Sequence, residues 1–483
     1  MTASRKHRFG VRADARDAQV ISSRVSKVFF ACILALVLSL PVGITPAFAD
    51  VRKADIILGV SVDSRGLSLA DCPSVDAEYA VVMAADGTLY FERNSKAATQ
   101  IASITKVMTA IIVLENTDKN TLITVSERAA YTGESSAELL AGDVLTRDDT
   151  LKALLLSSGN DAAVALAEAV GYILLGGANA NIEVDPWVAE QAFIDRMNER
   201  AQELGLVDTY FENPHGLDDD GFEGEQRSCA LDVARMVKFA MENETFRSIV
   251  ATAETDIEVI RAEGGKEKLH LESTDQMLGN FDGACGVKTG FTDLAGPCFA
   301  GAANREGEEY YAVVLDSSDA DQRFVDAQIL LQWIYDHQVE YPLAHSDRYV
   351  DIKKNGEVVS VPVVAEVAHS NWIDKTVKAT LADPDQAVAI FDLNGNINQT
   401  FEYNTVQGDV RIGDKLGTIT FKQRNDVLLT VDMVACEEMK APGLIEGIGI
   451  WWDRLFRKFS GQQTVAYSII VNQTPLLNPR GSG

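Results

Sequence analysis

The stretch Ala102-Ser103-Ile104-Thr105-Lys106-Val107-Met108-Thr109-Ala110 (residues 102–110) predicts the start of an amphipathic helix, and it decides the fold that we expect. Apolar side chains share one face of that helix, at Ile104, Val107, Met108, Ile111 and Leu114. Ser103 and Lys106 stand three positions apart, so the lysine amine can reach the serine hydroxyl. The positive end of the helix dipole also favours a developing oxyanion. This is the arrangement that an activated serine nucleophile needs.

A lysine acts as a base only when it is neutral. Lowering its pKa from about 10.4 to near 7 takes about 4 kcal/mol of differential stabilisation, which a second cation nearby helps to supply. The Ser-x-x-Lys spacing occurs about once by chance in a chain of this length, and for this motif alone a helix-capping serine followed by a surface lysine is the favoured interpretation. The Ser-x-x-Lys motif alone therefore does not identify a serine enzyme, and further motifs are needed.

A second motif, Ser158-Gly159-Asn160, lies between the predicted helices 151–156 and 162–170. The glycine permits a tight turn, so the serine hydroxyl and the asparagine amide can point into one cleft. There the serine can relay a proton, and the asparagine can orient a substrate amide or the lysine. By itself the motif is also typical of a loop with a helix cap.

A third motif, Lys288-Thr289-Gly290, ends the predicted edge strand 283–288. Such an edge pairs with an extended peptide, and Lys288 can pair with a terminal carboxylate. Taken alone, the motif is an ordinary strand-to-turn signal. Together the three motifs are more specific, because they follow one another in the order found in serine β-lactamases and penicillin-binding proteins.

The pattern around these motifs predicts an α+β domain over residues 77–339. Residues 77–93 alternate about Asp86-Gly87 as a hairpin, and residues 193–204 form a further helix. Short strands are expected at 298–303 and 310–315, with a helix at 321–335. One antiparallel sheet then joins the hairpin to a C-terminal meander, flanked by helices and with a helical lobe inserted between them.

The flanking regions differ in texture. Residues 50–76 form a lead-in, and residues 340–440 predict a small all-β, sandwich-like domain that serves as a spacer or recognition module. Its strands are expected at 349–353, 358–364, 376–381, 387–391 and 417–422. Residues 441–461 predict an amphipathic helix with Trp451 and Trp452 on its apolar stripe and cations opposite. It suits in-plane membrane binding, and the alternative is packing against the β domain. The tail, 462–483, has no assigned role.

Composition bounds the partners and the compartment. The net charge is −28 and the basic clusters lie at the two ends, which argues against nucleic acid. Basic residues up to Lys27, an apolar run at 28–40 and Ala47-Phe48-Ala49 predict a signal peptide over residues 1–49. An uncleaved anchor is the alternative, although the run is shorter than the roughly 20 residues that span a bilayer. Either way, the chain is expected to be exported.

Cysteines and histidines give no metal signal. Five cysteines follow the signal segment, namely Cys72, Cys229, Cys285, Cys298 and Cys436, and an odd number leaves at least one unpaired. Cys285 and Cys298 could form a cross-strand disulfide or remain two buried thiols. Neither a cysteine-histidine cluster nor an HExxH pattern has metal-ligand spacing, so we predict no metal and no cofactor.

The sequence segments around the three motifs identify a family. They are residues 102–110, Ser158-Gly159-Asn160-Asp161-Ala162-Ala163, Asn213-Pro214-His215-Gly216-Leu217 and Lys288-Thr289-Gly290-Phe291-Thr292. Over residues 77–337 the chain resembles the serine-type D-alanyl-D-alanine carboxypeptidases, which are low-molecular-mass penicillin-binding proteins with a β-lactamase/transpeptidase-like domain. The resemblance implies cleavage of the D-Ala-D-Ala terminus of peptidoglycan pentapeptides, and acylation by β-lactam antibiotics.

The same resemblance implies residue roles. Ser103 forms the acyl-enzyme, Lys106 accepts its proton, and Ser158 helps to protonate the leaving D-alanine. Substrate-holding residues are Asn160, Lys288, Thr289 and Gly290, and the oxyanion hole is formed by the backbone N–H groups of Ser103 and Phe291. His215 lies in the family segment Asn213-Pro214-His215-Gly216-Leu217, which looks structural, so we expect His215 to be a packed, hydrogen-bonded loop residue.

Three alternatives stay open. A DD-endopeptidase would use the same residues in a cleft of different shape. A serine β-lactamase needs a further group for fast deacylation, and no obvious glutamate motif follows Ser158-Gly159-Asn160. An inactive wall-binding protein would not need to keep all five polar motif residues. Residues 172–190 resemble an insertion and residues 218–226 are unusually acidic, which leaves the substrate preference open.

Overall fold

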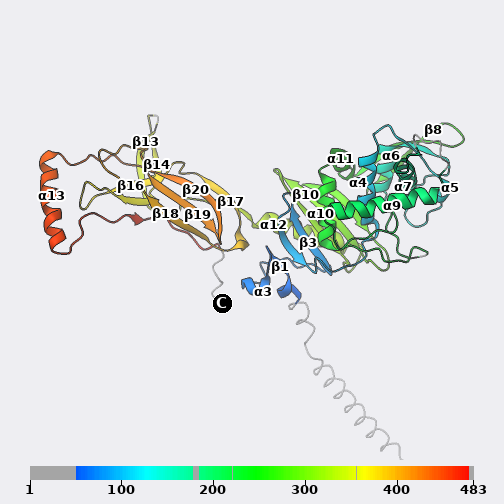
Figure 1. The fold of residues 1–483 in the computed structure, drawn as a ribbon, viewed down its shortest axis with the longest axis horizontal. Helices are drawn as coiled ribbons and strands as arrows, with labels where there is room; N and C mark the ends of the chain where they lie inside the picture. Colours follow the sequence, from blue (N-terminus) through cyan, green and yellow to red (C-terminus); the bar gives the residue numbers. More distant parts are fainter. Residues whose placement is uncertain (1–50, 178–183, 220, 355, 478–483) are drawn as a thin grey trace, which may run out of the picture. The chain divides into compact units, whose positions relative to one another are not determined.

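The computed structural model describes residues 51–177, 184–219, 221–354 and 356–477 (Figure 1). The predicted signal peptide, residues 1–49, lies outside them. The chain divides into two compact units, residues 1–55 with 61–72 and residues 56–60 with 73–483. In the first unit, α3 (Val62–Arg65) begins directly after its N-cap Ser61, and the Arg52 guanidinium donates to the carbonyl oxygens of Leu69 and Cys72.

A seven-stranded sheet carries the predicted hairpin and meander, in the order β2-β1-β4-β3-β11-β10-β9. The strands are β1 (Ile56–Ile57), β2 (Val60–Ser61), β3 (Tyr79–Ala84), β4 (Leu89–Arg93), β9 (Ala284–Gly290), β10 (Cys298–Arg305) and β11 (Glu308–Leu315). Pairings from β1 to β9 are antiparallel. The β3–β4 turn uses Asp86 and Gly87, where Gly87 has φ +93°. Strand β9 lies at the edge, as predicted.

Helices occupy the chain between β4 and β9 and after β11, which confirms the α+β class. They are the 3₁₀ turn η1 (Ala102–Thr105), α4 (Lys106–Asn116), α5 (Glu127–Ala130), α6 (Arg147–Leu155), α7 (Asn160–Leu174), α9 (Pro186–Glu203), α10 (Ala230–Met241), α11 (Glu244–Val250) and α12 (Gln322–His337). Helices α10 and α12 contact β11, and α4 contacts α6, α7 and α10. One buried apolar cluster joins α4, α7 and α10 to the sheet. Helix α4, which directly follows the turn that contains Ser103, is therefore fixed within the core.

One sequence expectation about the strands is wrong. The pattern predicts that strands return only near Gly283, but a four-stranded sheet in the order β5-β6-β7-β8 precedes that position. Its strands are β5 (Leu122–Thr124), β6 (Val144–Thr146), β7 (Glu254–Ile260) and β8 (Lys266–Glu272). In β7 only Ile257 and Val259 are buried, so charged residues dominate the segment and hide its alternation.

The C-terminal region is rich in strands, as predicted. Its elements are β12 (Gln338–Pro342), β13 (Tyr349–Lys354), β14 (Glu357–Pro362), β15 (Ala365–Ala368), β16 (Thr376–Leu381), β17 (Ala387–Phe391), η2 (Asp392–Asn394), β18 (Ile397–Tyr403), β19 (Lys415–Gln423), β20 (Asp426–Ala435) and β21 (Ile469–Ile470). Strands β12 and β17 pair, β13 and β14 pair, and the remaining six form one sheet in the order β18-β19-β20-β16-β15-β21. This region has its own apolar cluster.

The five cysteines of the described chain are free thiols. The alternative of a Cys285–Cys298 disulfide is wrong, because the β9–β10 register places Cys298 opposite Gly290 and Ala303 opposite Ala284. The two thiols therefore lie toward opposite ends of the ladder. Cys298 is buried and Cys285 is half-buried.

Helix α13 (Leu444–Phe459) turns its apolar side chains away from the protein. Leu444 is 92% exposed and Ile445 88%, and Ile448, Trp451, Trp452, Phe456 and Phe459 are also exposed. Among the partly covered residues, Gly447, Ile450, Arg454 and Arg457 lie on the other side of the helix, and Leu455 alone lies on the stripe. The alternative that the apolar stripe packs against the β-rich region is therefore wrong. Among the described residues, we find no helix whose length and apolar character would let it cross a membrane.

Candidate active site

The three motifs meet in one place. Ser103 lies in the turn η1, whose helix continues directly into α4 at Lys106. The Lys106 Nζ and Ser103 Oγ atoms are 2.6 Å apart, as the three-residue spacing predicts. The preceding residue, Ala102, has φ +46°, a left-handed conformation that favours glycine and is strained for other residues. The turn that presents the serine is therefore locally strained.

Lys106 is fully buried, with 0% of its surface exposed. Its Nζ lies 2.6 Å from Asn160 Oδ1, 3.3 Å from the His215 carbonyl oxygen and 3.4 Å from Ser158 Oγ. Burial first, and then the Lys288 ammonium, holds the pKa of Lys106 well below its usual value, while Asp161 opposes the shift. The amine can therefore be neutral and accept a proton at ordinary pH.

Ser158 and Asn160 are held rigidly at the start of α7. Ser158 has φ +60°, and Gly159 has no room for a side chain, because a Cβ there would lie 2.4 Å from Asp161 Oδ1. The Asn160 amide nitrogen donates to the Gly133 carbonyl at 2.9 Å, which leaves its oxygen facing Lys106. This supports the sequence-based expectation that the asparagine orients the lysine.

Lys288 projects from β9 and is only 1% exposed. Its Nζ donates to Ser158 Oγ at 2.9 Å and to the Thr289 carbonyl at 3.0 Å. Burial first, and then Arg323, lowers the pKa of Lys288 to about 7, while Asp275 opposes the shift. The Ser158 hydroxyl thus lies between two buried amines, and this places the expected second cation beside Lys106.

The end of β9 also contacts the nucleophile turn. A Cβ on Gly290 would lie 2.7 Å from the Ile101 carbonyl oxygen and 3.3 Å from the Ser103 backbone nitrogen, so only glycine allows this approach. The next residue, Phe291, is 58% exposed. The backbone leading to Phe291 therefore lies beside the backbone of Ser103, although the two predicted oxyanion donors stay a prediction.

These groups open onto a cavity of about 350 Å³. It is lined by Ser103, Glu134, Ser135, Ser158, Asn160, Leu217, Asp219, Thr274, Thr289, Gly290, Phe291, Thr292, Asp293 and Arg323. Lys106 and Lys288 lie behind this lining, in contact with Ser158. Acidic residues 134, 219 and 293 belong to the lining as well. The cavity brings together every site residue that the sequence analysis named, either in its wall or directly behind it.

Two residues of this site escaped the sequence analysis. Arg323, at the start of α12, lines the cavity and donates from Nη1 to the Gly290 carbonyl at 3.1 Å. Asp275 is buried, and burial raises its pKa to about 6 against the opposing pull of Lys288 and Arg323. Neither belongs to a motif, and a helix or turn pattern gives no sign that Arg323 lines the cavity or that Asp275 acts on Lys288 from the interior.

His215 behaves as the sequence analysis expects. It is buried, its Nδ1 accepts a hydrogen bond from the Leu217 backbone N–H, and burial holds its pKa well below the usual value. Its ring packs edge-on against Phe222. Only its backbone carbonyl touches the reacting groups, through Lys106.

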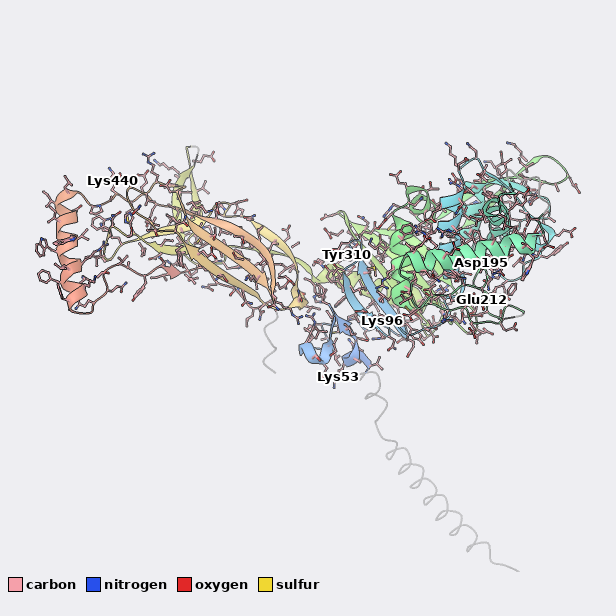
Figure 2. All side chains as sticks on the ribbon, viewed as in Figure 1. Lys53, Lys96, Asp195, Glu212, Tyr310 and Lys440 are labelled. Atoms are coloured by element: carbon pink, nitrogen blue, oxygen red, sulfur yellow. The ribbon has the colours of Figure 1, made fainter. Side chains whose placement is uncertain are left out.

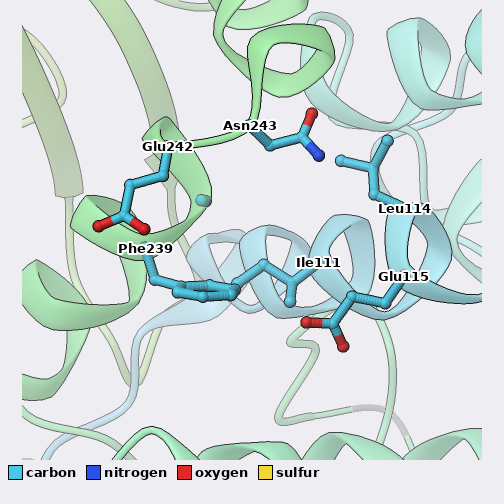
Figure 3. A pocket seen from close by; sticks show the side chains of 7 residues that line it. Ile111, Leu114, Glu115, Phe239, Glu242 and Asn243 are labelled. Carbon is cyan, nitrogen blue, oxygen red and sulfur yellow. The ribbon is translucent and has the colours of Figure 1, made fainter.

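A second cavity, of about 230 Å³, lies between the end of α4 and the end of α10 (Figure 3). Ile111, Leu114 and Phe239 give it an apolar wall, and the carboxylates of Glu115 and Glu242 lie at its rim (Figure 3). It contains no residue of the three motifs. No chemistry is assigned to it.

The profile of the D-alanyl-D-alanine carboxypeptidase peptidase family matches residues 68–319, slightly more than half of the chain. The chain belongs to this family. The D-alanyl-D-alanine carboxypeptidase DacF of Bacillus subtilis is 28% identical over 378 residues, covering 77% of this chain and 87% of that protein. A D-alanyl-D-alanine carboxypeptidase of Streptomyces sp. (strain K15) is 31% identical over 254 residues, covering 51% and 82%.

Solved structures agree on the fold of this carboxypeptidase family. A mutant of the Streptomyces K15 DD-transpeptidase superimposes with a TM-score of 0.50 at 28% identity, covering 55% of this chain and 99% of that one. The D-alanyl-D-alanine carboxypeptidase DacD of Francisella tularensis gives a TM-score of 0.50 at 23% identity, covering 76% and 94%. The penicillin-binding-protein fold predicted from the three motifs is thereby confirmed.

Proposed function

We propose that this protein removes the terminal D-alanine from peptidoglycan stem pentapeptides, acting as a serine-type D-alanyl-D-alanine carboxypeptidase in cell-wall synthesis and remodelling. The observation that carries the proposal is the chain of contacts Ser103 Oγ–Lys106 Nζ–Ser158 Oγ–Lys288 Nζ, with distances of 2.6, 3.4 and 2.9 Å, in which both serines line one cavity and both lysines lie behind its wall. Family membership supports the same activity.

Acylation follows from these contacts. Neutral Lys106 takes the proton of Ser103, whose Oγ attacks the carbonyl carbon of the penultimate D-alanine. As the Oγ–C bond forms, the carbonyl oxygen becomes an oxyanion, which the N–H groups of Ser103 and Phe291 stabilise. The C–N bond then breaks, and the departing nitrogen receives the proton from Lys106 through Ser158. Free D-alanine leaves, and the peptide stays as an ester on Ser103.

Deacylation reverses the first step with water. A water molecule gives a proton to the same lysine and serine relay, its oxygen attacks the ester carbon, and the C–Oγ bond breaks. Ser103 recovers its proton, and the shortened peptide leaves with a new carboxylate. A β-lactam enters the same path through its ring carbonyl, which supports covalent inhibition by penicillins.

Cations at the cavity fit the carboxylate of the D-Ala-D-Ala terminus. Lys288 and Arg323 both lie at the end of β9, where Arg323 lines the cavity and Thr289 offers a hydroxyl. An extended peptide can pair with the β9 edge while these residues bind its terminal carboxylate and Asn160 binds its backbone amide.

We propose further that the mature chain works outside the cytoplasmic membrane and binds its outer face through α13. An apolar stripe with two tryptophans and the cations Arg457 and Lys458 suits a lipid interface. The exposure of this stripe supports the same conclusion, because an apolar face of this size is rarely left to water. The predicted signal peptide, residues 1–49, supports export.

Intact-protein mass spectrometry tests the proposed activity. The mature chain is incubated separately with a D-Ala-D-Ala pentapeptide, with a cross-linked peptide dimer and with penicillin, alongside Ser103→Ala and the surface control Ser248→Ala. We expect D-alanine release and a slowly lost penicilloyl adduct with the control, and neither with Ser103→Ala. Rapid penicillin turnover without D-alanine release would indicate a β-lactamase. Cleavage of cross-linked dimers alone would indicate an endopeptidase, and no reaction a wall-binding protein.

A further inference from the structure

The chain after α13 returns to the β-rich region. Strand β21 pairs antiparallel with β15, with Ile470 opposite Ala365 and Ile469 opposite Glu366, and so becomes the edge strand of the six-stranded sheet. The Ser468 hydroxyl also accepts a hydrogen bond from the Ala368 backbone N–H at 3.0 Å. Residues 462–477 are therefore built into the fold, whereas the sequence analysis gave this tail no role.

Asn472 fixes the returning segment. It is only 5% exposed, and its Oδ1 accepts from the His345 backbone N–H at 2.6 Å. Its Nδ2 donates to the Leu343 carbonyl at 2.9 Å and to Gln399 Oε1 at 3.0 Å. Backbone bonds from Val471 and Asn472 to the Val364 carbonyl add to these contacts. A buried, multiply bonded asparagine of this kind holds two chain segments together.

The N-terminal end and the middle of α13, the last helix in Figure 1, are also held by hydrogen bonds. Before the helix, Met439 and Val410 exchange two backbone hydrogen bonds. The carbonyl of the next residue, Lys440, which is labelled in Figure 2, accepts a hydrogen bond from Trp372 Nε1 at 3.1 Å. Within the helix, Arg454 Nη2 donates to the carbonyls of Ser370 and Trp372 at 2.5 and 2.9 Å. These contacts engage the polar side only.

We infer that residues 462–477 form a strap that keeps α13 folded, with its apolar stripe outward, before the protein meets a membrane. A free helix of 16 residues is marginal in water, and Gly447 and Gly449 weaken it further. The strap anchors the chain just after the helix to the β-rich region, in addition to the Met439–Val410 pair before the helix and the Arg454 contacts within it. Because the helix is already ordered, the loss of chain entropy on docking is smaller and lipid binding is tighter.

The strap also fixes how the helix meets a bilayer. Both ends of α13 return to the same β-rich region, so the helix can lie in the interface plane but cannot thread across it. This second consequence rests on the membrane association proposed above, whereas the folding of α13 by the strap does not.

Hydrogen exchange and vesicle sedimentation on the full mature chain test the inference. The variants are Asn472→Ala and, as a milder opening of the strap, Gln473→Pro, which removes the donor of the 2.8 Å bond to the His345 carbonyl. Asn404→Ala, outside the strap, is the matched control. Without lipid, we expect amides 444–459 to exchange at least about tenfold faster in both strap variants. Binding to phosphatidylglycerol–phosphatidylcholine vesicles should weaken about tenfold, with D-alanine release unchanged.

The outcomes separate the two proposals. If residues 469–473 exchange faster in the variants while residues 444–459 keep wild-type protection, the strap inference is overturned. Gln473→Pro covers the case in which Asn472→Ala fails to fold, which loss of D-alanine release would reveal. If exchange depends on the strap but even wild-type chain ignores the vesicles, the strap stands and the membrane proposal falls.

Discussion

In most proteins apolar side chains are buried and charged side chains are exposed. The Ser103 cavity and the helix α13 depart from this pattern in opposite directions. Directly behind the cavity wall, the residues Lys106 and Lys288 are 0% and 1% exposed, although burying an ionisable amine is destabilising. In α13, apolar side chains such as Leu444 remain in water, although burying them would be favourable. Both departures oppose stability, and each coincides with a proposed activity. The comparison indicates that functional sites lie where the residues present lower the stability of the fold.

The substitution Lys106→Met is the most stringent test of whether the buried amine serves activity at the expense of stability. This change replaces the buried amine with an apolar side chain of similar length and removes the general base. We expect kcat/KM for D-alanine release to fall about 10³-fold, while the free energy of unfolding does not decrease. Lys152→Met, at a partly exposed ion pair with Asp149, is the control and should leave kcat/KM unchanged. A strongly destabilised Lys106→Met would show that the amine is structural.

The opposite change applies to the helix. The triple substitution Leu444→Ser, Ile445→Ser and Ile448→Ser removes three exposed apolar side chains. Burying each of them in lipid contributes about 1.5–3 kcal/mol to the free energy of binding. Vesicle binding should weaken at least about 10²-fold, while the melting temperature and the hydrolysis of soluble peptide stay unchanged. Glu446→Gln, on the polar side, serves as the control. A drop in melting temperature would instead indicate that the stripe packs against protein.

A third prediction concerns pH. In the free enzyme the pKa of Lys288 is about 7, so its ammonium is present below that pH and lost above it. A carboxylate substrate loses its partner as the amine deprotonates, and kcat/KM should fall about tenfold for each pH unit above 7. Lys288→Arg keeps its charge and should extend activity to higher pH. Identical alkaline limbs in the two proteins would exclude Lys288 as the titrating group.

The smallest expected effect is at Asp275. Its carboxylate raises the pKa of Lys288, so Asp275→Asn should move the alkaline limb of kcat/KM to lower pH by less than about one unit. Asparagine keeps an oxygen for the Met277 backbone N–H, which preserves the turn. In a Lys288→Arg background the shift should disappear, and its persistence would place the effect elsewhere.

Sequence alone predicted the reacting groups better than their surroundings. The pairing of Ser103 with Lys106 could be predicted because helix spacing depends only on nearby residues. The hairpin at Asp86-Gly87 could be predicted because the turn depends on its own residues. Arg323 could not be predicted, since only the packing of α12 brings it to the Gly290 carbonyl, 33 positions away. Strand β7 was also hidden, because charged residues dominate its exposed positions.

The hydroxyl of Ser158 lies within reach of both lysine amines, and this has a consequence for any titration of the enzyme. Groups that share a hydrogen-bonding partner give up their protons as a set, so macroscopic constants describe the ensemble of microstates and not one side chain. Each limb of an activity profile will then respond to substitution at the other lysine. Site-specific nitrogen NMR on both amines, in place of kinetics, can resolve where the proton resides at each pH.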